Sequence, residues 1–377
     1  MISMGFEQLL NPSNPFLWVF IVGIVAGAGA VLARPFYTYV KFVYPNAKFE
    51  AIGNPFINSK HLEGLLQSKT LDALLETINA QKDYALSGST VQEIQQALDA
   101  HFFGSVEMMR KDSTTKLNGF YDAFLYKYDL HLIKQELTHI LIRNETSDTQ
   151  TDSALLQETQ KLFQDIHASE PEQIPSALRI HGYPDNLVSI MQEEDGDPQL
   201  LQATLDIISY QRLQDATVPY KCAKGKQQLV RILRDVRNVK NLLRTKHLSY
   251  EPEKIQHYFM GEGKEIAQWK YHELAEVQAV SQVISGLEGT SYYEPLKNSI
   301  DVYNKEHSIQ YLETVLDTHS IHLIRDLSQQ HYVTIGPTIR FLISKEYEIQ
   351  NLKAIVKGIA ENLPRDRIQR LLVMEDA

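Results

Sequence analysis

Apolar residues recur every three or four positions along most of this chain, which is the spacing that gathers them on one face of an α-helix. Two clear stripes are Leu229, Ile232, Leu233, Val236, Val239 and Leu243, and then Leu342, Ile349, Leu352 and Ile359. Asn362 and Pro364 predict a break before a last short helix over residues 365–373. No long segment of the sequence alternates strictly between apolar and polar residues, so the pattern predicts an all-α protein with no more than incidental strands.

The helical stretches carry one short polar pattern three times. An acid is followed five residues later by a lysine, and in two copies an asparagine lies between them: Asp129 and Lys134; Asp235, Asn238 and Lys240; Glu348, Asn351 and Lys353. A Leu-Asp pair precedes each acid by about 30 residues, at Leu98-Asp99, Leu205-Asp206 and Leu316-Asp317. Two marks that keep their distance in three copies predict a triplicated helical unit with a repeat of about 110 residues.

Segments that are polar or contain Pro and Gly separate the units, at residues 146–153, 170–184 and 261–264. The predicted organisation is an N-terminal segment followed by three helical repeats, over residues 1–43, 44–160, 161–265 and 266–377. Each repeat has the size of a usual domain.

The repeated polar residues are best explained by packing. An acid and a lysine five positions apart do not share the favoured spacing for an ion pair within one helix, so we expect them to contact neighbouring helices. Asn238 and Asn351 are expected to bond a loop backbone, because a buried amide without a partner costs about 1–3 kcal/mol. These residues are therefore predicted to be structural and to be candidates for an interface, with no catalytic role.

The N-terminal segment differs from the rest because it contains an uncharged apolar run from Phe16 to Ala33. Its length is at the short end of the range for a helix that spans a bilayer. Trp18 suits an interface between lipid and water, and Gly23 and Gly27 form a small-residue face that allows close helix contact. The run therefore predicts a transmembrane anchor.

The charges around this run predict its orientation, because Arg34 and later lysines follow it and only Glu7 precedes it. The positive-inside rule then places the N-terminus outside and the following chain in the cytoplasm. Two alternatives are a cleaved signal peptide, which would need a basic start that is missing here, and a buried helix of a soluble protein.

Composition narrows the function. The net charge of −10 disfavours general binding to nucleic acid, and a single cysteine, Cys222, excludes an intramolecular disulfide and a zinc site of paired cysteines. The sequence contains no Gly-rich phosphate-binding loop, and His319 and His322 lack an accompanying set of carboxylates. We therefore predict no catalytic residue, no cofactor and no metal.

Several stretches resemble one family, the C subunit of archaeal-type and bacterial V-type ATP synthases, whose eukaryotic relative is the d subunit of the V-ATPase. They are the C-terminal stretch from Lys345 to Ile355 with Lys357-Gly358, Leu363-Pro364 and Ile368, the stretch from Asp235 to Lys246, and Tyr44 to Lys48. The resemblance covers residues 44–377. The sequence departs from the family at Lys48, where arginine is usual, and at His131 and Leu132, where a polar residue and asparagine are expected. The apolar N-terminal extension is similar to a variant in some archaeal members.

The resemblance implies a three-fold pseudo-symmetric helical funnel that sits on the cytoplasmic face of a membrane ring of proteolipid subunits. It implies that the rotor shaft inserts into the funnel, so that the protein couples ATP synthesis or hydrolysis to proton or sodium transport without catalytic residues of its own. With the predicted anchor, the expected partners are shaft subunits, the proteolipid ring and lipid, with no nucleic acid and no small-molecule substrate. The alternative is a membrane-anchored helical-repeat scaffold for another partner, and an enzyme is the third and poorest interpretation.

Overall fold

The computed structural model describes residues 15–53, 59–81, 83–146, 156–193 and 196–375. These residues form α-helices and short 3-10 helices joined by turns, with no β-strand among them. The prediction of an all-α protein is therefore confirmed. The predicted loop over residues 146–153 lies almost entirely outside the described residues.

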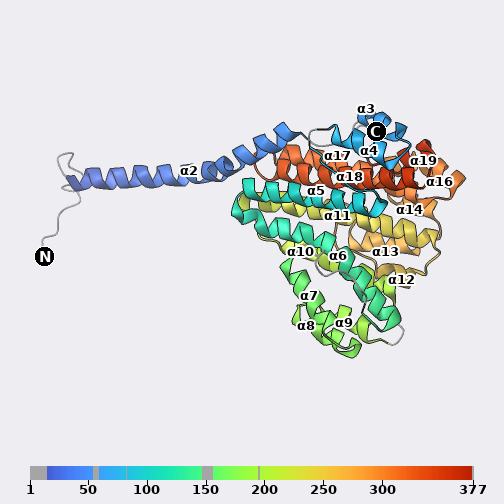
Figure 1. Cartoon of the computed structure of the whole chain (residues 1–377). Helices are drawn as coiled ribbons and strands as arrows, with labels where there is room; N and C mark the ends of the chain where they lie inside the picture. Colours follow the sequence, from blue (N-terminus) through green and yellow to red (C-terminus); the bar gives the residue numbers. More distant parts are fainter. Residues whose placement is uncertain (1–14, 54–58, 82, 147–155, 194–195, 376–377) are drawn as a thin grey trace.

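Three helical hairpins make up the centre of the body (Figure 1). They consist of α5 (Val91–Asp112) with α6 (Asn118–Arg143), α10 (Pro198–Asp215) with α11 (Tyr220–His247), and α17 (Ile309–Gln330) with α18 (Gly336–Ala360). Each predicted Leu-Asp pair lies on the first helix of a hairpin, and each repeated acid lies on the second.

The hairpins pack in a cyclic order. The second helix of each hairpin contacts the first helix of another: α6 lies against α10, α11 against α17, and α18 against α5. The contact between α18 and α5 joins the last hairpin to the first, so the order closes on itself.

Local sequence signals set the ends of these helices. Thr90 caps α5 and forms a capping box with Glu93, and Asp197 accepts the first free N–H groups of α10. Pro198 fits the first turn of α10, where a missing N–H costs nothing. Asn144 ends α6 with a left-handed backbone (φ 54°), a conformation that asparagine tolerates better than most residues.

Shorter helices complete the body around the three hairpins. They are α3 (Ser59–Gln67), α4 (Leu71–Asn79), α7 (Gln157–His167), α8 (Ile174–Ile180), α9 (Asp185–Gln192), α12 (Pro252–Gln256), α13 (Gln268–Glu276), α14 (Val280–Gly286), α15 (Tyr293–Lys297), α16 (Ile300–Glu306) and α19 (Arg365–Gln369), with 3-10 helices η1 (Thr115–Leu117) and η3 (Pro171–Gln173). Helix α19 is shorter than the last helix expected from the sequence.

The apolar core has three clusters. One combines the start of α6 and α11 with α5 and α18, and thus joins both ends of the chain. The second packs the end of α11 against α13, α14 and α17, and the third packs the end of α6 against α7 to α10. Helices α6 and α11 each cross from the first cluster into another.

Helix α2 (Pro15–Ile52) is a single helix of 38 residues that projects from the body (Figure 1). Its last turns bury Phe42, Asn46 and Phe49 at helical spacing, and the Phe49 ring stacks on Phe341 at 5.5 Å between centroids. The projecting part instead exposes its apolar side chains, among them Trp18, Val19, Phe20, Val22, Ile24, Val25, Val31 and Leu32.

Across the stretches that the structure describes, no helix has both the length and the apolar character needed to cross a membrane. The transmembrane anchor predicted over Phe16 to Ala33 is therefore unsupported. The side chain of Phe16 lies outside the described residues, Trp18 and Ala33 are exposed, and the space beside Gly23 and Gly27 is open. The predicted small-residue face thus packs against no other helix in the described part of this chain.

Candidate functional site

Three equivalent ion pairs connect the hairpins in the same cyclic order as the helix contacts. Each joins a repeated lysine to the aspartate of a Leu-Asp pair at 2.6 Å: Lys134 to Asp206, Lys240 to Asp317, and Lys353 to Asp99. The lysines therefore pair across to a neighbouring helix, as their spacing from the acids led us to expect. The sequence showed both partners of every pair but gave no means to match them.

Each repeated acid is buried and serves a local purpose. The Asp235 carboxylate accepts three backbone N–H bonds, from Lys264 at 2.9 Å, Glu265 at 2.8 Å and Ile266 at 2.9 Å. Burial raises the pKa of Asp235 to about 6, although the N–H donors oppose this rise. This acid holds the loop after α12 against α11.

Asp129 and Glu348 occupy the same position in the other two hairpins but have different partners. Asp129 accepts the backbone N–H of Leu156 at 2.9 Å. Glu348 accepts a hydrogen bond from the Tyr84 hydroxyl and lies 3.5 Å from the Lys345 ammonium. Burial raises the pKa of Glu348 to about 7, against the opposing effect of Lys345.

The two repeated asparagines each clamp a loop by its backbone, as the sequence predicted. Asn238 donates to the Gly261 carbonyl at 3.1 Å and accepts from the Met260 N–H at 2.8 Å. Asn351 donates to the Val373 carbonyl at 2.7 Å and accepts from the N–H of the same residue at 2.9 Å. The first hairpin has Leu132 at this position, and its side chain packs against the third apolar cluster.

Further charged groups converge where the hairpins meet. Lys127 of α6 pairs with Glu346 of α18 at 2.7 Å, which adds a link between the first and last hairpins. Arg237 pairs with Asp206 at 2.7 Å, so the Asp206 carboxylate forms ion pairs with both Arg237 and Lys134. Burial opposes ionisation of Asp206, but Arg237 and Lys134 outweigh it and lower its pKa. Asp206 is therefore ionised and paired with both cations.

A cavity of about 700 Å³ opens beside this junction, between α5, α6 and α18. Its lining includes Asp99, Lys127, Glu346, Gln350 and Lys353. We call these five residues the junction surface. Lys127 and Gln350 are exposed, and the Lys353–Asp99 pair keeps 30% and 32% of its side-chain surfaces exposed. These residues carry both signs of charge and are accessible to a partner, while Phe103, Tyr128 and Leu132 add an apolar part to the lining of the same cavity.

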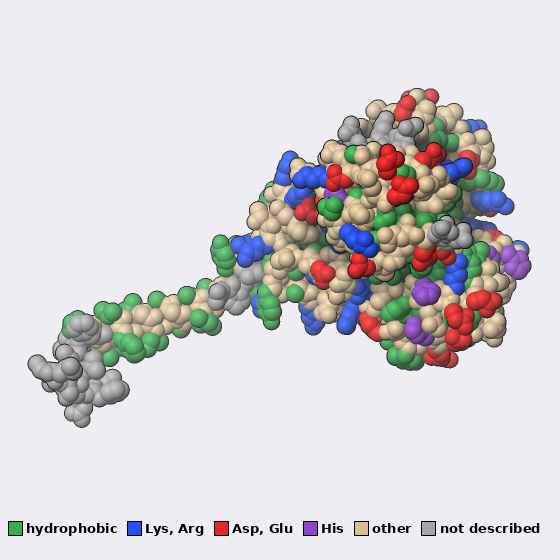
Figure 2. Space-filling view, turned by 90° about the horizontal axis from the view of Figure 1, so that it is seen from below, with side chains coloured by type: hydrophobic (Ala, Val, Ile, Leu, Met, Phe, Trp, Pro, Cys, Tyr) green, Lys and Arg blue, Asp and Glu red, His purple; other side chains and the backbone are tan. Residues whose placement is uncertain are grey.

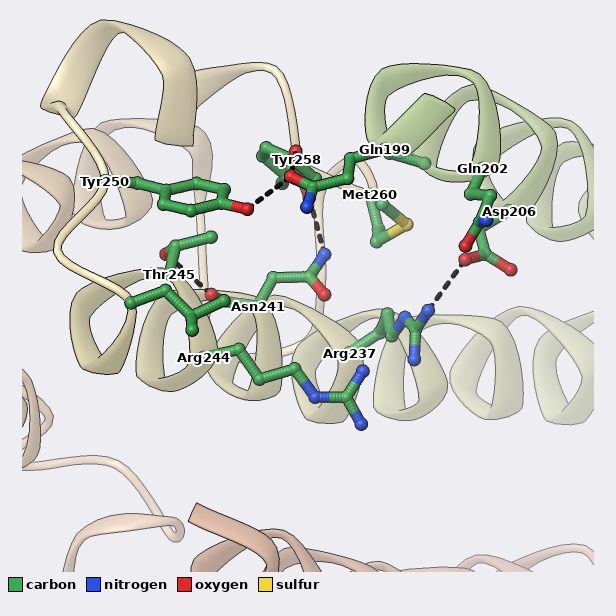
Figure 3. A pocket seen from close by; sticks show the side chains of 12 residues that line it. Gln199, Gln202, Asp206, Arg237, Asn241, Arg244, Thr245, Tyr250, Tyr258 and Met260 are labelled. Carbon is green, nitrogen blue, oxygen red and sulfur yellow. Dashed lines mark hydrogen bonds and ion pairs between the residues drawn. The ribbon is translucent and has the colours of Figure 1, made fainter. Parts of the chain in front are cut away.

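A smaller cavity of about 230 Å³ lies between α10, α11 and the segment that follows α11 (Figure 3). Arg237 bonds Asp206 at its edge, and Arg244 pairs with Glu313 of α17. Asn241 donates to the Tyr258 carbonyl at 2.8 Å. The charged groups of this cavity are paired within the chain, and its lining comes from the second hairpin and the segment that follows it.

Groups that could carry chemistry are placed unfavourably for it. Burial raises the pKa of the Cys222 thiol to about 12, so a reactive thiolate does not form at neutral pH. Burial also lowers the pKa of His319, and the described residues contain no cluster of three or more His, Cys, Asp or Glu placed to hold a metal.

Known proteins place this architecture in context. The family described as ATP synthase (C/AC39) subunit matches residues 45–371. The chain is 25% identical to the C subunit of the A-type ATP synthase from Methanosphaera stadtmanae, over 98% of this chain and 97% of that protein. It is 26% identical to the protein of the same name from Methanothermobacter thermautotrophicus over 98% and 97%, and 27% identical to that of Methanocaldococcus jannaschii over 96% and 94%.

Proposed function

Because the chain belongs to the ATP synthase (C/AC39) subunit family, whose members are structural stalk proteins, we propose that it joins the rotor shaft of an archaeal-type ATP synthase to the proteolipid ring. It transmits torque between them, and thereby couples ATP synthesis or hydrolysis to the transport of protons or sodium ions. It works at the cytoplasmic face of the cell membrane, and it is related to the d subunit of the eukaryotic V-ATPase.

The cyclic order of the hairpins is the observation that carries this proposal. A link in a rotor must pass torque around its axis without opening at a seam. Three equivalent ion pairs at 2.6 Å bridge the three hairpin contacts, and Lys127–Glu346 adds a further bridge between the first and last hairpins. This arrangement supports a funnel with approximate three-fold symmetry, formed by the repeats over residues 44–160, 161–265 and 266–377.

The junction surface is the proposed contact with the shaft. Its exposed polar groups suit a partner helix that carries charges of both signs, and the paired charges around it hold the socket in shape. The repeated residues hold the helices and loops around this contact in place. They are Asp129, Lys134, Asp235, Asn238, Lys240, Glu348, Asn351 and Lys353.

Site-directed crosslinking in the assembled complex tests this contact. Cys222 is buried and unreactive, so a Gln350→Cys variant carries one accessible thiol on the junction surface. A Lys297→Cys variant, on the outer helix α15, is the matched control. We expect a heterobifunctional crosslinker to join position 350, but not position 297, to a shaft protein. Equal products at both positions, or products with stator proteins only, would contradict the proposal.

A further inference from the structure

One end of the body gathers the turns of all three hairpins. A Cβ placed on Gly119 would lie 3.8 Å from the backbone of Thr217, so the α5–α6 turn approaches the α10–α11 turn. A Cβ placed on Gly225 would lie 2.8 Å from the side chain of Ile335, so the start of α11 approaches the α17–α18 turn. The three turns therefore form one continuous surface.

Helix α2 is rooted in this same surface. Asn46 donates to the carbonyls of Tyr332 at 2.7 Å and Thr334 at 3.0 Å, both in the α17–α18 turn. Lys48 pairs with Asp112, at the end of α5, at 2.6 Å. The apolar, exposed part of α2 thus projects from the end that carries the turns (Figure 1).

Basic and aromatic side chains surround the root of α2, and we call them the collar. The collar consists of Lys111, Lys116, Tyr220, Lys221, Lys224 and Tyr332, all exposed. Tyr220 exposes 89% of its surface and Tyr332 exposes 53%. None of the four lysines forms an ion pair with another residue in the part of the chain that the structure describes.

Two of the acids close to the collar are paired with cations. Asp112 is held by Lys48, and Asp122 is held by Arg110. Three exposed acids also lie in this region: Asp215, which accepts a hydrogen bond from Gln211 at 2.9 Å, Glu262, which lines the groove beside Tyr220 and Lys221, and Glu50, in the last turn of α2. Although the chain has a net charge of −10, this end is locally basic. Figure 2 shows a group of blue side chains near the root of the projecting helix, with a few red ones among them and more red ones farther from the root.

A groove lies next to the α11 part of the collar. It has a volume of about 880 Å³ and lies beside Tyr220, Lys221 and Lys224, and Arg231 and Gln227 continue its lining along α11. Such a groove accommodates small anionic groups better than a flat surface does, because several cations can reach one ligand.

We propose that the collar binds the headgroups of an anionic lipid membrane while the apolar part of α2 contacts the lipid beside it. Lysines at a membrane surface attract anionic lipids, and tyrosines suit the boundary between water and lipid. A folded anionic protein would be recognised by the lysines alone and would leave the apolar side chains of α2 exposed, so lipid explains both features. The inference rests on the proposed function for the placement of the protein at a membrane.

Vesicle flotation of the full chain tests the inference. The vesicles contain phosphatidylcholine alone, or phosphatidylcholine mixed with phosphatidylglycerol. The variant Lys221→Glu/Lys224→Glu reverses two collar charges, and Lys297→Glu/Lys305→Glu reverses two exposed charges on α15 and α16. Thermal unfolding of each variant checks that the fold is kept.

We expect tighter binding to the anionic vesicles than to the neutral ones, and a loss of about tenfold or more in the collar variant only. The excess binding to anionic vesicles should also weaken at high salt. Equal binding of the wild type to both kinds of vesicle, or unchanged binding of the collar variant, would overturn the inference. The crosslink from position 350 to the shaft is independent of this result, so the two proposals can fail separately.

Discussion

At the scale of single residues, the three equivalent buried acids obtain their hydrogen bonds from different partners. Asp235 is held by three backbone N–H groups, Asp129 by the N–H of Leu156, and Glu348 by the Tyr84 hydroxyl and Lys345. The sequence predicted that these positions are structural, because they recur. It could not predict most of the partners, since all except Lys345, on the same helix as Glu348, come from loops and turns that do not share the repeat.

Gly263 shows how closely one such loop fits. A Cβ at this position would lie 1.7 Å from Oδ1 of Asp235, so any larger residue must displace the loop that satisfies this buried carboxylate. We expect Gly263→Ala to lower the free energy of unfolding by about 2–4 kcal/mol. The control is Gly104→Ala in the middle of α5, where the added methyl meets open space and should stabilise the helix by up to about 1 kcal/mol. Chemical denaturation measures both, and equal effects would contradict the account.

Glu348 is expected to make stability depend on pH near neutrality. Its pKa is about 7 in the folded protein, against 4.5 as the usual value. The folded state favours the protonated form, so this contribution to stability is full below about 4.5 and is lost as pH rises through 7.

The Glu348→Gln variant isolates this effect because glutamine mimics the protonated acid. We expect the stability of the wild type relative to this variant to fall by up to about 3 kcal/mol as pH rises from 4.5 to 7. Denaturant unfolding at several pH values measures the difference. A difference that is constant across this range would show that Glu348 is ionised throughout.

At the scale of helices, the apolar spacing was enough to predict the class of fold and the second helices of the second and third hairpins, α11 and α18. The cyclic pairing was not predictable, because the distance along the chain from Lys353 to Asp99 resembles no distance between the other partners. Helix α2 shows a different limit. The change in composition near residue 43 predicted a boundary, but one continuous helix runs through it, since Phe42 and Phe49 bind to the body on a shared face.

The Lys353–Asp99 pair tests the contact between α18 and α5. Lys353→Glu places two carboxylates side by side and should destabilise the protein by about 1 kcal/mol, a modest effect because both side chains are partly exposed to solvent. The exchange Lys353→Glu/Asp99→Lys should recover most of the loss. Thermal or chemical unfolding of the single and double variants gives the coupling energy between the two residues. No recovery in the double variant would mean that the pair does not stabilise the contact between α18 and α5.

At the scale of the whole molecule, the proposed function depends on the closed cycle of hairpins and on which end of the body faces the membrane. The three hairpins contact one another in a cycle, and α2 and the collar mark the end proposed to face the membrane. The sequence predicted the repetition, and its resemblance to a family implied the socket. It could not place the collar, because Lys116, Lys221 and Tyr332 come from three turns that only the folded chain brings together.

A density map of the assembled ATP synthase tests most directly the central claim, that the closed cycle of hairpins forms a socket for the shaft. We expect shaft helices against the junction surface, an unbroken contact between α18 and α5, and α2 pointing toward the membrane. A shaft bound to the outer helices, or a first hairpin separated from the last, would contradict it.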